Sequence, residues 1–275
     1  MDQESINLVV GEIAPLLTGR VPGKIFQLGP AALAIDFGLR AAGYLYLNAE
    51  PAAPRLYLTQ RRVRDLEKES RPLAQFGQSL RKELAQKKLL SIDKEKADRI
   101  VRLTFGGTDE LGNVVARHLV AQLTGRSANL LILDDGGIVI RTLRASQTAG
   151  QHVGDVYRQT DSSRPKPTGK QSGLMQLIRS GRFATASAAA DHYFTSLLAE
   201  KHFGNGLHLY WARHYPEAEA QFRQAVDYFN QDARYLYFLG LSQLAQKSKL
   251  KRDAAYYSFE QAARLEAQGD RKSVV

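Results

Sequence analysis

The sequence contains no cysteine, only two methionines and a single tryptophan among 275 residues. Without cysteine the chain can form no disulfide, no thiolate zinc site and no cysteine nucleophile. No apolar run approaches the roughly 18 residues that a membrane-spanning helix needs. The first five residues are acidic and polar, unlike the basic start of a secretory signal. These absences predict a cytoplasmic protein with no membrane partner.

Motifs that carry catalysis are also missing. The sequence has neither a Gly-x-Ser-x-Gly nucleophile elbow nor a His-Glu-x-x-His zinc motif. The segment 19–25 is one residue short of a phosphate-binding loop and lacks its Ser or Thr. The six histidines are not spaced as metal ligands. We therefore expect no catalytic residue, no metal and no cofactor, and predict that the protein is not an enzyme.

Positive charge is in excess and unevenly distributed. The formal net charge is +10, which favours a polyanionic partner such as nucleic acid. Residues 55–102 carry 14 Lys and Arg against 7 Asp and Glu, whereas residues 203–275 carry 10 against 8. This distribution predicts a polyanion site in the N-terminal half. The alternative is a solvated surface whose charges form ordinary pairs along helices.

The hydrophobic pattern of the first part changes between helical and strand periods. Residues 5–17 have a helical period with Ser5 as a candidate cap and Gly19 as a stop, and 73–89 predicts a second helix. Short apolar runs separated by Pro, Gly and Asn predict antiparallel strands. The strand candidates are 24–28, 32–37, 44–47, 56–58, 100–105, 114–123, 130–133 and 138–143. Residues 1–145 are therefore predicted to form one α+β domain.

The remainder of the chain predicts a linker followed by helices. Residues 146–173 are rich in Ser, Thr, Gly, Pro and Lys and are interpreted as a linker, and 174–202 as a helical segment. In residues 203–275, Gly206 and Gly240 are 34 residues apart, and each precedes an Ala, Phe, Ala trio. The trios are 218, 222 and 225, then 255, 259 and 262, the second displaced by three extra residues around 248–251. This pattern resembles a pair of tetratricopeptide repeats.

Five segments of the first 160 residues together resemble one family. They are Leu16–Val21 leading to Lys24–Gln27, then Pro54–Thr59, Phe76–Leu84, Asp98–Val101 and Leu123–Asp134. In this order and spacing they are similar to the N-terminal domain of the NFACT family, also called fibronectin-binding protein A N-terminus. The segment Ala188–Phe194 resembles the start of the family's next region. The likeness fades near Glu200, where the tetratricopeptide-like pattern begins.

The resemblance implies both a fold and a role. The fold would be like the N-terminal domain of formamidopyrimidine-type DNA glycosylases, followed by a linker and an all-helical tail. Family members take part in ribosome quality control, where they rescue stalled ribosomes. They bind large ribosomal subunits obstructed by peptidyl-tRNA, recruit tRNA and support C-terminal tailing. Of this chain's residues, the resemblance associates Asp98 and Arg99 with tRNA handling. Motif match and charge add the RNA-contact candidates Arg20, Lys24, Arg81, Lys82 and Arg126.

Each of these interpretations has a structural alternative. Asp98 and Arg99 could form an ion pair at the start of a strand, and Arg81 and Lys82 could be a solvated helix face. Glycosylase chemistry is disfavoured. Those glycosylases use an N-terminal proline amine with a glutamate next to it, whereas here Met1 is followed by Asp2 and Gln3. A protein-interaction scaffold, acting through a protein partner at the helical repeats, is the alternative function. The absence of a secretory signal argues against a surface role in fibronectin binding.

Overall fold

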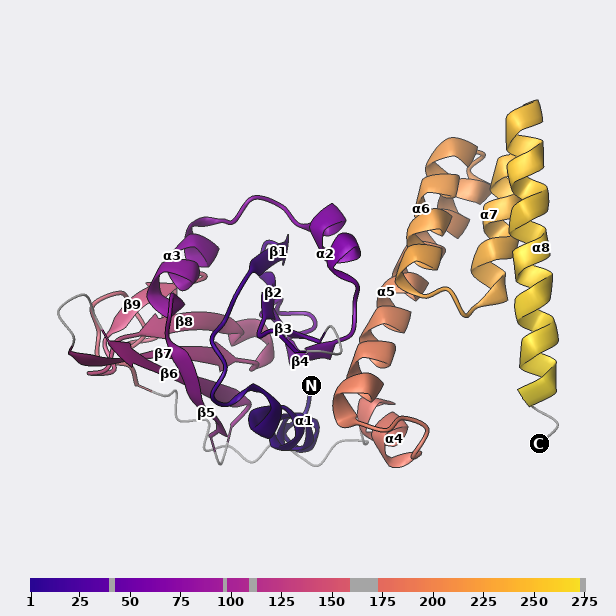
Figure 1. The fold of residues 1–275 in the computed structure, drawn as a ribbon. Coiled ribbons are helices and arrows are strands. Elements are labelled where there is room, and N and C mark those ends of the chain that lie inside the picture. The colour runs from indigo at the N-terminus through magenta and orange to yellow at the C-terminus, as the bar shows by residue number, and fades with distance from the viewer. Residues whose placement is uncertain (40–42, 96–97, 109–112, 159–172, 273–275) are drawn as a thin grey trace. The chain divides into compact units, whose positions relative to one another are not determined.

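The computed structural model describes residues 1–39, 43–95, 98–108, 113–158 and 173–272, with side chains described as far as residue 268. The chain divides into two compact units, residues 1–191 and 192–275, which are considered separately (Figure 1). The first unit contains two antiparallel sheets and the second only helices, so the predicted α+β class is confirmed. Among the described residues, no helix combines the length and apolar character needed to cross a membrane.

The first sheet is a four-stranded meander in the order β1-β2-β3-β4. Its strands are β1 (Ile25–Gly29), β2 (Ala32–Asp36), β3 (Tyr44–Asn48) and β4 (Arg55–Thr59). Helix α1 (Gln3–Leu17) packs against β4, and the short helix α2 (Val63–Glu69) packs against β1. The buried face of α1 is formed by Ile6, Val9, Ile13 and Leu17. These side chains follow the helical period of the sequence, and they form one side of the hydrophobic core.

The second sheet has five strands in the order β5-β6-β7-β8-β9. These are β5 (Lys88–Lys94), β6 (Ile100–Thr108), β7 (Val114–Gln122), β8 (Asn129–Leu133) and β9 (Val139–Thr142), with the 3-10 turn η1 (Gly125–Ser127) before β8. Helix α3 (Gln75–Leu84) contacts both β1 and β9. The interpretation of residues 146–173 as a linker fits only in part. Val156 pairs with Ile138, and Tyr157 packs on the sheet's apolar face, whereas 159–172 lie outside the described residues.

Two local predictions were wrong, and two elements were missed. Asp2 caps α1, not Ser5, because its carboxylate accepts the Ser5 N–H at 2.8 Å and the helix begins at Gln3. The second predicted helix ends at Leu84 instead of continuing to residue 89. Gln86 adopts a left-handed φ of 59° there, and Leu89 pairs with Phe105 as part of β5. Neither β5 nor α2 was predicted. The expected stop after α1 is confirmed, with Gly19 at φ 84°.

The free edge of β4 is covered by other parts of the first unit. The Leu58 N–H donates to the Ser187 hydroxyl at 3.3 Å, and the Leu56 N–H faces the Met1 sulfur at 3.4 Å. Ser187 lies at the start of α5 (Ala186–Trp211), which follows α4 (Gly173–Arg179). The Ser187 N–H in turn donates to the Glu12 carboxylate of α1 at 2.9 Å. The start of α5 therefore belongs structurally to the first unit.

The second unit consists of two helical hairpins. The later part of α5 packs against α6 (Tyr215–Tyr228), and α7 (Ala233–Ala245) pairs with α8 (Lys249–Lys272). A Cβ atom on Gly206 would lie 2.6 Å from the Phe222 ring, and one on Gly240 would lie 2.6 Å from the Phe259 ring. The same glycine-to-phenylalanine contact therefore recurs in both hairpins, as the repeat pattern predicts. Assignment to the tetratricopeptide family stays a prediction.

The two hairpins have turns of equal length. Residues 212–214 link α5 to α6, and residues 246–248 link α7 to α8. The three extra residues of the second repeat therefore lie at the start of α8. Ala255 is the seventh residue of this helix. Its counterpart Ala218 is the fourth residue of α6. Compared with α6, the start of α8 is thus extended by almost one helical turn.

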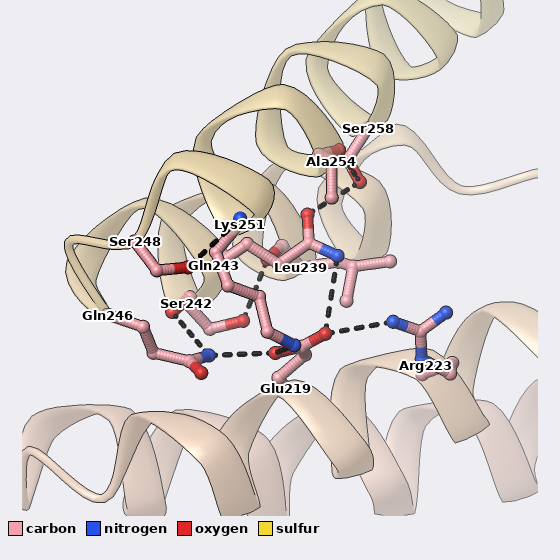
Figure 2. A network of polar contacts seen from close by, with 10 residues as sticks. All are labelled: Glu219, Arg223, Leu239, Ser242, Gln243, Gln246, Ser248, Lys251, Ala254 and Ser258. Atoms are coloured by element: carbon pink, nitrogen blue, oxygen red, sulfur yellow. Dashed lines mark hydrogen bonds and ion pairs between the residues drawn. The ribbon is translucent and has the colours of Figure 1, made fainter.

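A buried carboxylate joins the hairpins. Glu219 of α6 is 6% exposed and pairs with Arg223 at 2.8 Å and with Lys251 of α8 at 2.6 Å. It also accepts a hydrogen bond from the Gln246 side chain at 2.7 Å (Figure 2). The Gln243 amide completes this set, and its oxygen accepts from Ser258 at 3.0 Å. Together these contacts lower the pKa of Glu219 to about 2 despite its burial.

Candidate nucleic-acid interface

Cationic groups gather at one end of the two sheets, where β4 and β6 begin. The Met1 amine donates to the Pro54 carbonyl at 3.1 Å, immediately before β4. Burial, together with the smaller effects of the nearby Arg99 and Arg55 charges, lowers the pKa of this amine to about 6, while Asp2 opposes the shift. Coulombic effects of this kind require that both guanidinium groups lie near the amine. The amine, Arg55 and Arg99 therefore place positive charge close together at this end of the sheets.

Arg55 is the most buried cation of this group. Only 5% of the residue is exposed, and its guanidinium lies 5.4 Å from the centroid of the Tyr46 ring. It donates to the Tyr46 hydroxyl at 3.5 Å and to the Ala53 carbonyl at 3.4 Å. Tyr46 packs on Tyr57 of β4 with ring centroids 5.2 Å apart. These contacts fix the guanidinium in position, although burial of a charge is costly.

Asp98 and Arg99 immediately precede β6. Asp98 is buried, and its carboxylate accepts the Arg99 backbone N–H at 2.7 Å, which shapes the chain just before the strand begins. Arg99 is half-buried, and its carbonyl accepts the Leu123 N–H at 2.8 Å from the end of β7. Arg126 follows in η1 and is exposed. The fold thus brings Asp98, Arg99 and Arg126 to the same end of the sheet.

A fourth arginine is held at this end by the buried Asn129. The Asn129 side chain donates to the Arg144 carbonyl at 2.9 Å and accepts the Arg144 N–H at 3.1 Å. The Arg144 guanidinium reaches across to the carbonyl of Ala49, just after β3. We call the group formed by Arg55, Arg99, Arg126 and Arg144, together with the Met1 amine, the arginine end. Its four arginines come from four separate segments, and Arg144 links the two sheets through its contact with Ala49.

Two of the predicted RNA contacts make other interactions, away from this end. Arg20 lies beyond the C-terminus of α1, a helix of 15 residues and therefore about 22 Å long. Its guanidinium donates to the carbonyls of Leu16 at 2.8 Å and Gly38 at 3.1 Å, so it ties α1 to the segment after β2. Lys24 pairs with Glu67 at 2.7 Å and lies 5.0 Å from the centroid of the Phe26 ring. Both have structural partners.

Arg81 and Lys82 also lie apart from the arginine end. They are exposed on the last turn of α3, shortly before β5. The start of β5 is tied to the end of α1, because the Leu89 N–H donates to the Arg20 carbonyl at 2.8 Å. No ion pair within the described part of the chain involves Arg81 or Lys82. The seven predicted contacts therefore separate into two groups on the first unit.

Sequence reasoning missed Arg55 and Arg144 as site residues. Arg55 lies in Pro54–Thr59, one of the five segments that resemble the family. A cation at the start of a strand in such a segment was the signal that could have identified it. Nothing comparable marks Arg144, whose place depends on Asn129, 15 residues earlier in the chain. Asp134, at the end of the segment Leu123–Asp134, shapes a turn, because its carboxylate accepts the Ile138 N–H at 2.8 Å. Within the described ranges, no group of three His, Asp or Glu residues could hold a metal ion.

Comparisons with known proteins agree on one family. The family described as NFACT N-terminal and middle domains matches residues 2–204. The Rqc2 homolog RqcH from two strains of Streptococcus pneumoniae is 32% identical over 120 residues, which is 43% of this chain and 21% of the relative. The chain thus matches about a fifth of the length of these curated relatives.

One solved structure supports the fold. It is the N-terminal domain of the fibronectin-binding protein PavA from Streptococcus pneumoniae, which aligns with a TM-score of 0.51 and 24% identity. The alignment covers 63% of this chain and 67% of that one. At this level of identity the likeness concerns the fold alone.

Proposed function

Because the chain belongs to the family of NFACT N-terminal and middle domains, we propose that it is a non-enzymatic RNA-binding protein related to ribosome-associated quality control. It binds tRNA through the arginine end of its first unit. One observation carries this proposal. The fold places Arg55, beside the Pro54 carbonyl that holds the Met1 amine, at the same end as Arg99 and Arg144, so positive charge is concentrated there and an anion is favoured.

The chemistry of the arginine end suits a phosphate backbone. A guanidinium can hold two phosphate oxygens at once and can stack on a base, which an ammonium group cannot do. Arg55 and Arg144 are already fixed by contacts to Tyr46 and Ala49, so little side-chain freedom is lost on binding. Arg99 and Arg126 are more exposed and would make the direct contacts. Such binding weakens steeply with salt, because counterions are released.

The wider role follows from the family and is part of the proposal. In it, the protein contributes to handling tRNA on a large ribosomal subunit obstructed by peptidyl-tRNA, and so supports C-terminal tailing of the stalled chain. The name of the relative RqcH supports this reading, although the match covers 21% of that protein. We rank tRNA binding before subunit binding, because the arginine end lies within the matched region.

Binding of bulk tRNA to the full chain tests the proposal. Affinity would be measured between about 50 and 200 mM salt for the wild type and for Arg99→Ala, with circular dichroism as the control for folding. We expect the variant to bind about tenfold more weakly, which corresponds to about 1.4 kcal/mol. The matched control is Arg81→Ala, which removes one exposed arginine from the other group and should change affinity less than about twofold.

The opposite results would be equally clear. If folded Arg99→Ala keeps the wild-type affinity while Arg81→Ala loses it, then tRNA binds at the start of β5 and the arginine end is structural. If the folded wild type does not bind tRNA at all, the proposal fails. Base excision or strand cleavage of an oxidised-base duplex by the pure protein would show that it is an enzyme.

A protein-interaction scaffold is the second candidate. It is favoured by Tyr256 and Tyr257 of α8, each 65% exposed, because large apolar side chains at adjacent exposed positions often mark partner contacts. In this case Tyr256→Ala/Tyr257→Ala would leave both folding and tRNA affinity unchanged. The variant would nevertheless lose the protein partners that cross-link to the wild-type second unit.

A further inference from the structure

The second unit has a cationic end, although its overall charge is nearly balanced. The α5–α6 and α7–α8 turns lie together at this end, because Glu219 near the start of α6 bonds both Gln246 and Lys251 (Figures 1 and 2). We call it the turn end. Its exposed cations are Arg213, Lys247, Lys249 and Arg252. Among the residues that the structure describes, none of these four takes part in an ion pair.

Acidic side chains at the turn end do not balance these cations. Glu219 is buried and already paired with Arg223 and Lys251, so it contributes little negative potential outside the unit. The other acidic residues near this end are Glu217, in the first turn of α6, and Asp253, the fifth residue of α8. Most of the unit's remaining acids lie further along α6 and α8 or beside the 229–232 turn, away from this end. The turn end is therefore a local positive surface.

Two of these cations occupy equivalent places in the two hairpins, and the longer start of α8 adds a third. Arg213 and Lys247 are 34 residues apart, and both adopt left-handed backbone angles, with φ of 65° and 56°. Glycine would adopt this conformation with less strain than arginine or lysine. The backbone conformation therefore does not account for a cationic residue at these two positions. The three residues that extend the start of α8 relative to α6 add Lys249 to the same place. Two independent features thus increase positive charge at this end.

Next to these cations stands the only tryptophan of the chain. Trp211 ends α5, two residues before Arg213, and is 73% exposed. Its ring makes an edge contact with Tyr210, at a centroid distance of 5.4 Å. Leu250 beside Lys249 is 78% exposed. An exposed indole costs free energy in water, and its face is a good platform for stacking a base.

We propose that the turn end binds single-stranded nucleic acid, with a base stacked on Trp211 and phosphates held by Arg213, Lys247, Lys249 and Arg252. A combination of an aromatic platform with surrounding cations is how sequence-tolerant binding of single strands is built. A folded duplex offers phosphates but few free base faces, so single strands are favoured. This site is separate from the arginine end and does not depend on the tRNA proposal.

Trp211 itself supplies the assay. Because the chain has one tryptophan, its fluorescence reports on the turn end alone. The full chain would be titrated with oligo(U) and oligo(dT) of about 12 nucleotides, and binding would also be followed by anisotropy of the labelled strand. We expect quenching with either strand. A preference for oligo(U) would identify contacts to the 2′-hydroxyl and so RNA as the ligand.

Charge variants test the phosphate contacts. Lys249→Ala/Arg252→Ala should bind at least about fivefold more weakly, and its log–log salt slope should fall by about 1.4, the value for two phosphate contacts on a single strand. Lys201→Ala/Arg264→Ala is the matched control, since it removes two exposed cations elsewhere in the unit. Arg213→Gly/Lys247→Gly is a second variant, which removes charge while still permitting the left-handed turns.

Three results would overturn the proposal. The first is binding of the labelled strand with unchanged tryptophan fluorescence, which places the strand elsewhere on the chain. The second is an equal loss of affinity in the matched control variant. The third is stronger quenching by an oligoglutamate peptide than by either oligonucleotide, which would identify an acidic protein as the partner. Arg99→Ala should leave the quenching unchanged, so failure of this site and failure of the tRNA site are distinguishable.

Discussion

Replacing Glu219 by Gln should destabilise the second unit in a pH-dependent way. The side chain is only 6% exposed and pairs with Arg223 and Lys251 (Figure 2). Its pKa falls from 4.5 to about 2 in the folded chain. A shift of this size corresponds to about 3 kcal/mol, and we take that as an upper limit because Arg223 remains partly solvated. We therefore expect Glu219→Gln to cost about 2–3 kcal/mol near pH 7.

The sign of the pH dependence follows from the lowered pKa. The ionised carboxylate is the form that the folded state favours, so its contribution is complete above the unfolded pKa of 4.5 and is lost as pH falls toward about 2. The difference between the wild type and Glu219→Gln should therefore be constant at neutral pH. It should shrink progressively between about pH 5 and pH 2.

Urea unfolding followed by Trp211 fluorescence measures this difference, because the only tryptophan lies in the second unit. Glu260→Gln is the control, since Glu260 makes only an exposed pair with Arg264, for which we expect less than about 0.5 kcal/mol. The reasoning is refuted if Glu219→Gln costs no more than this control at neutral pH. It is also refuted if the cost is the same at about pH 3 as at about pH 7.

Two further predictions concern packing and positioning. Gly240→Ala should destabilise the second unit by about 1–3 kcal/mol, because the added methyl group meets the Phe259 ring. Gly204→Ala, where nothing lies within 4 Å, should stabilise it by up to about 1 kcal/mol, and thermal unfolding compares the two. Asn129→Ala should cost about 1–2 kcal/mol, because it leaves two partly buried backbone groups of Arg144 unbonded. This variant should also weaken tRNA binding, which the salt series would detect; unchanged unfolding would contradict the role assigned to Asn129.

The elements that could be predicted from sequence are those whose signal is local. The amphipathic face of α1 and the strands separated by Gly, Pro and Asn follow from residues close together in the chain. The prediction for residues 73–89 was wrong because helical spacing continued past Leu84. The left-handed Gln86 and the pairing of Leu89 with Phe105 are set by the tertiary structure. A strand that follows a helix within a few residues gives no separate periodic signal.

The candidate site shows the same limit. Asp98, Arg99 and Arg126 are adjacent to motifs and could be selected from sequence, whereas Arg144 reaches the arginine end only through Asn129 and the carbonyl of Ala49. Arg20, by contrast, matched a motif for a structural reason, because its guanidinium ties α1 to the segment after β2. A motif identifies residues that a fold needs. It does not distinguish those that bind a ligand from those that hold the backbone.

The contacts that cover the free edge of β4 affect how the chain folds during synthesis and which fragments of it can be prepared. The Ser187 hydroxyl that meets Leu58 is 129 residues further along the chain, so during synthesis the strand's outer N–H groups await a much later segment. Until α5 begins to fold, β4 presents an apolar edge that could pair with another chain. A fragment ending at residue 145 would keep this edge open and should self-associate. One ending near residue 191 retains the contacts that cover it.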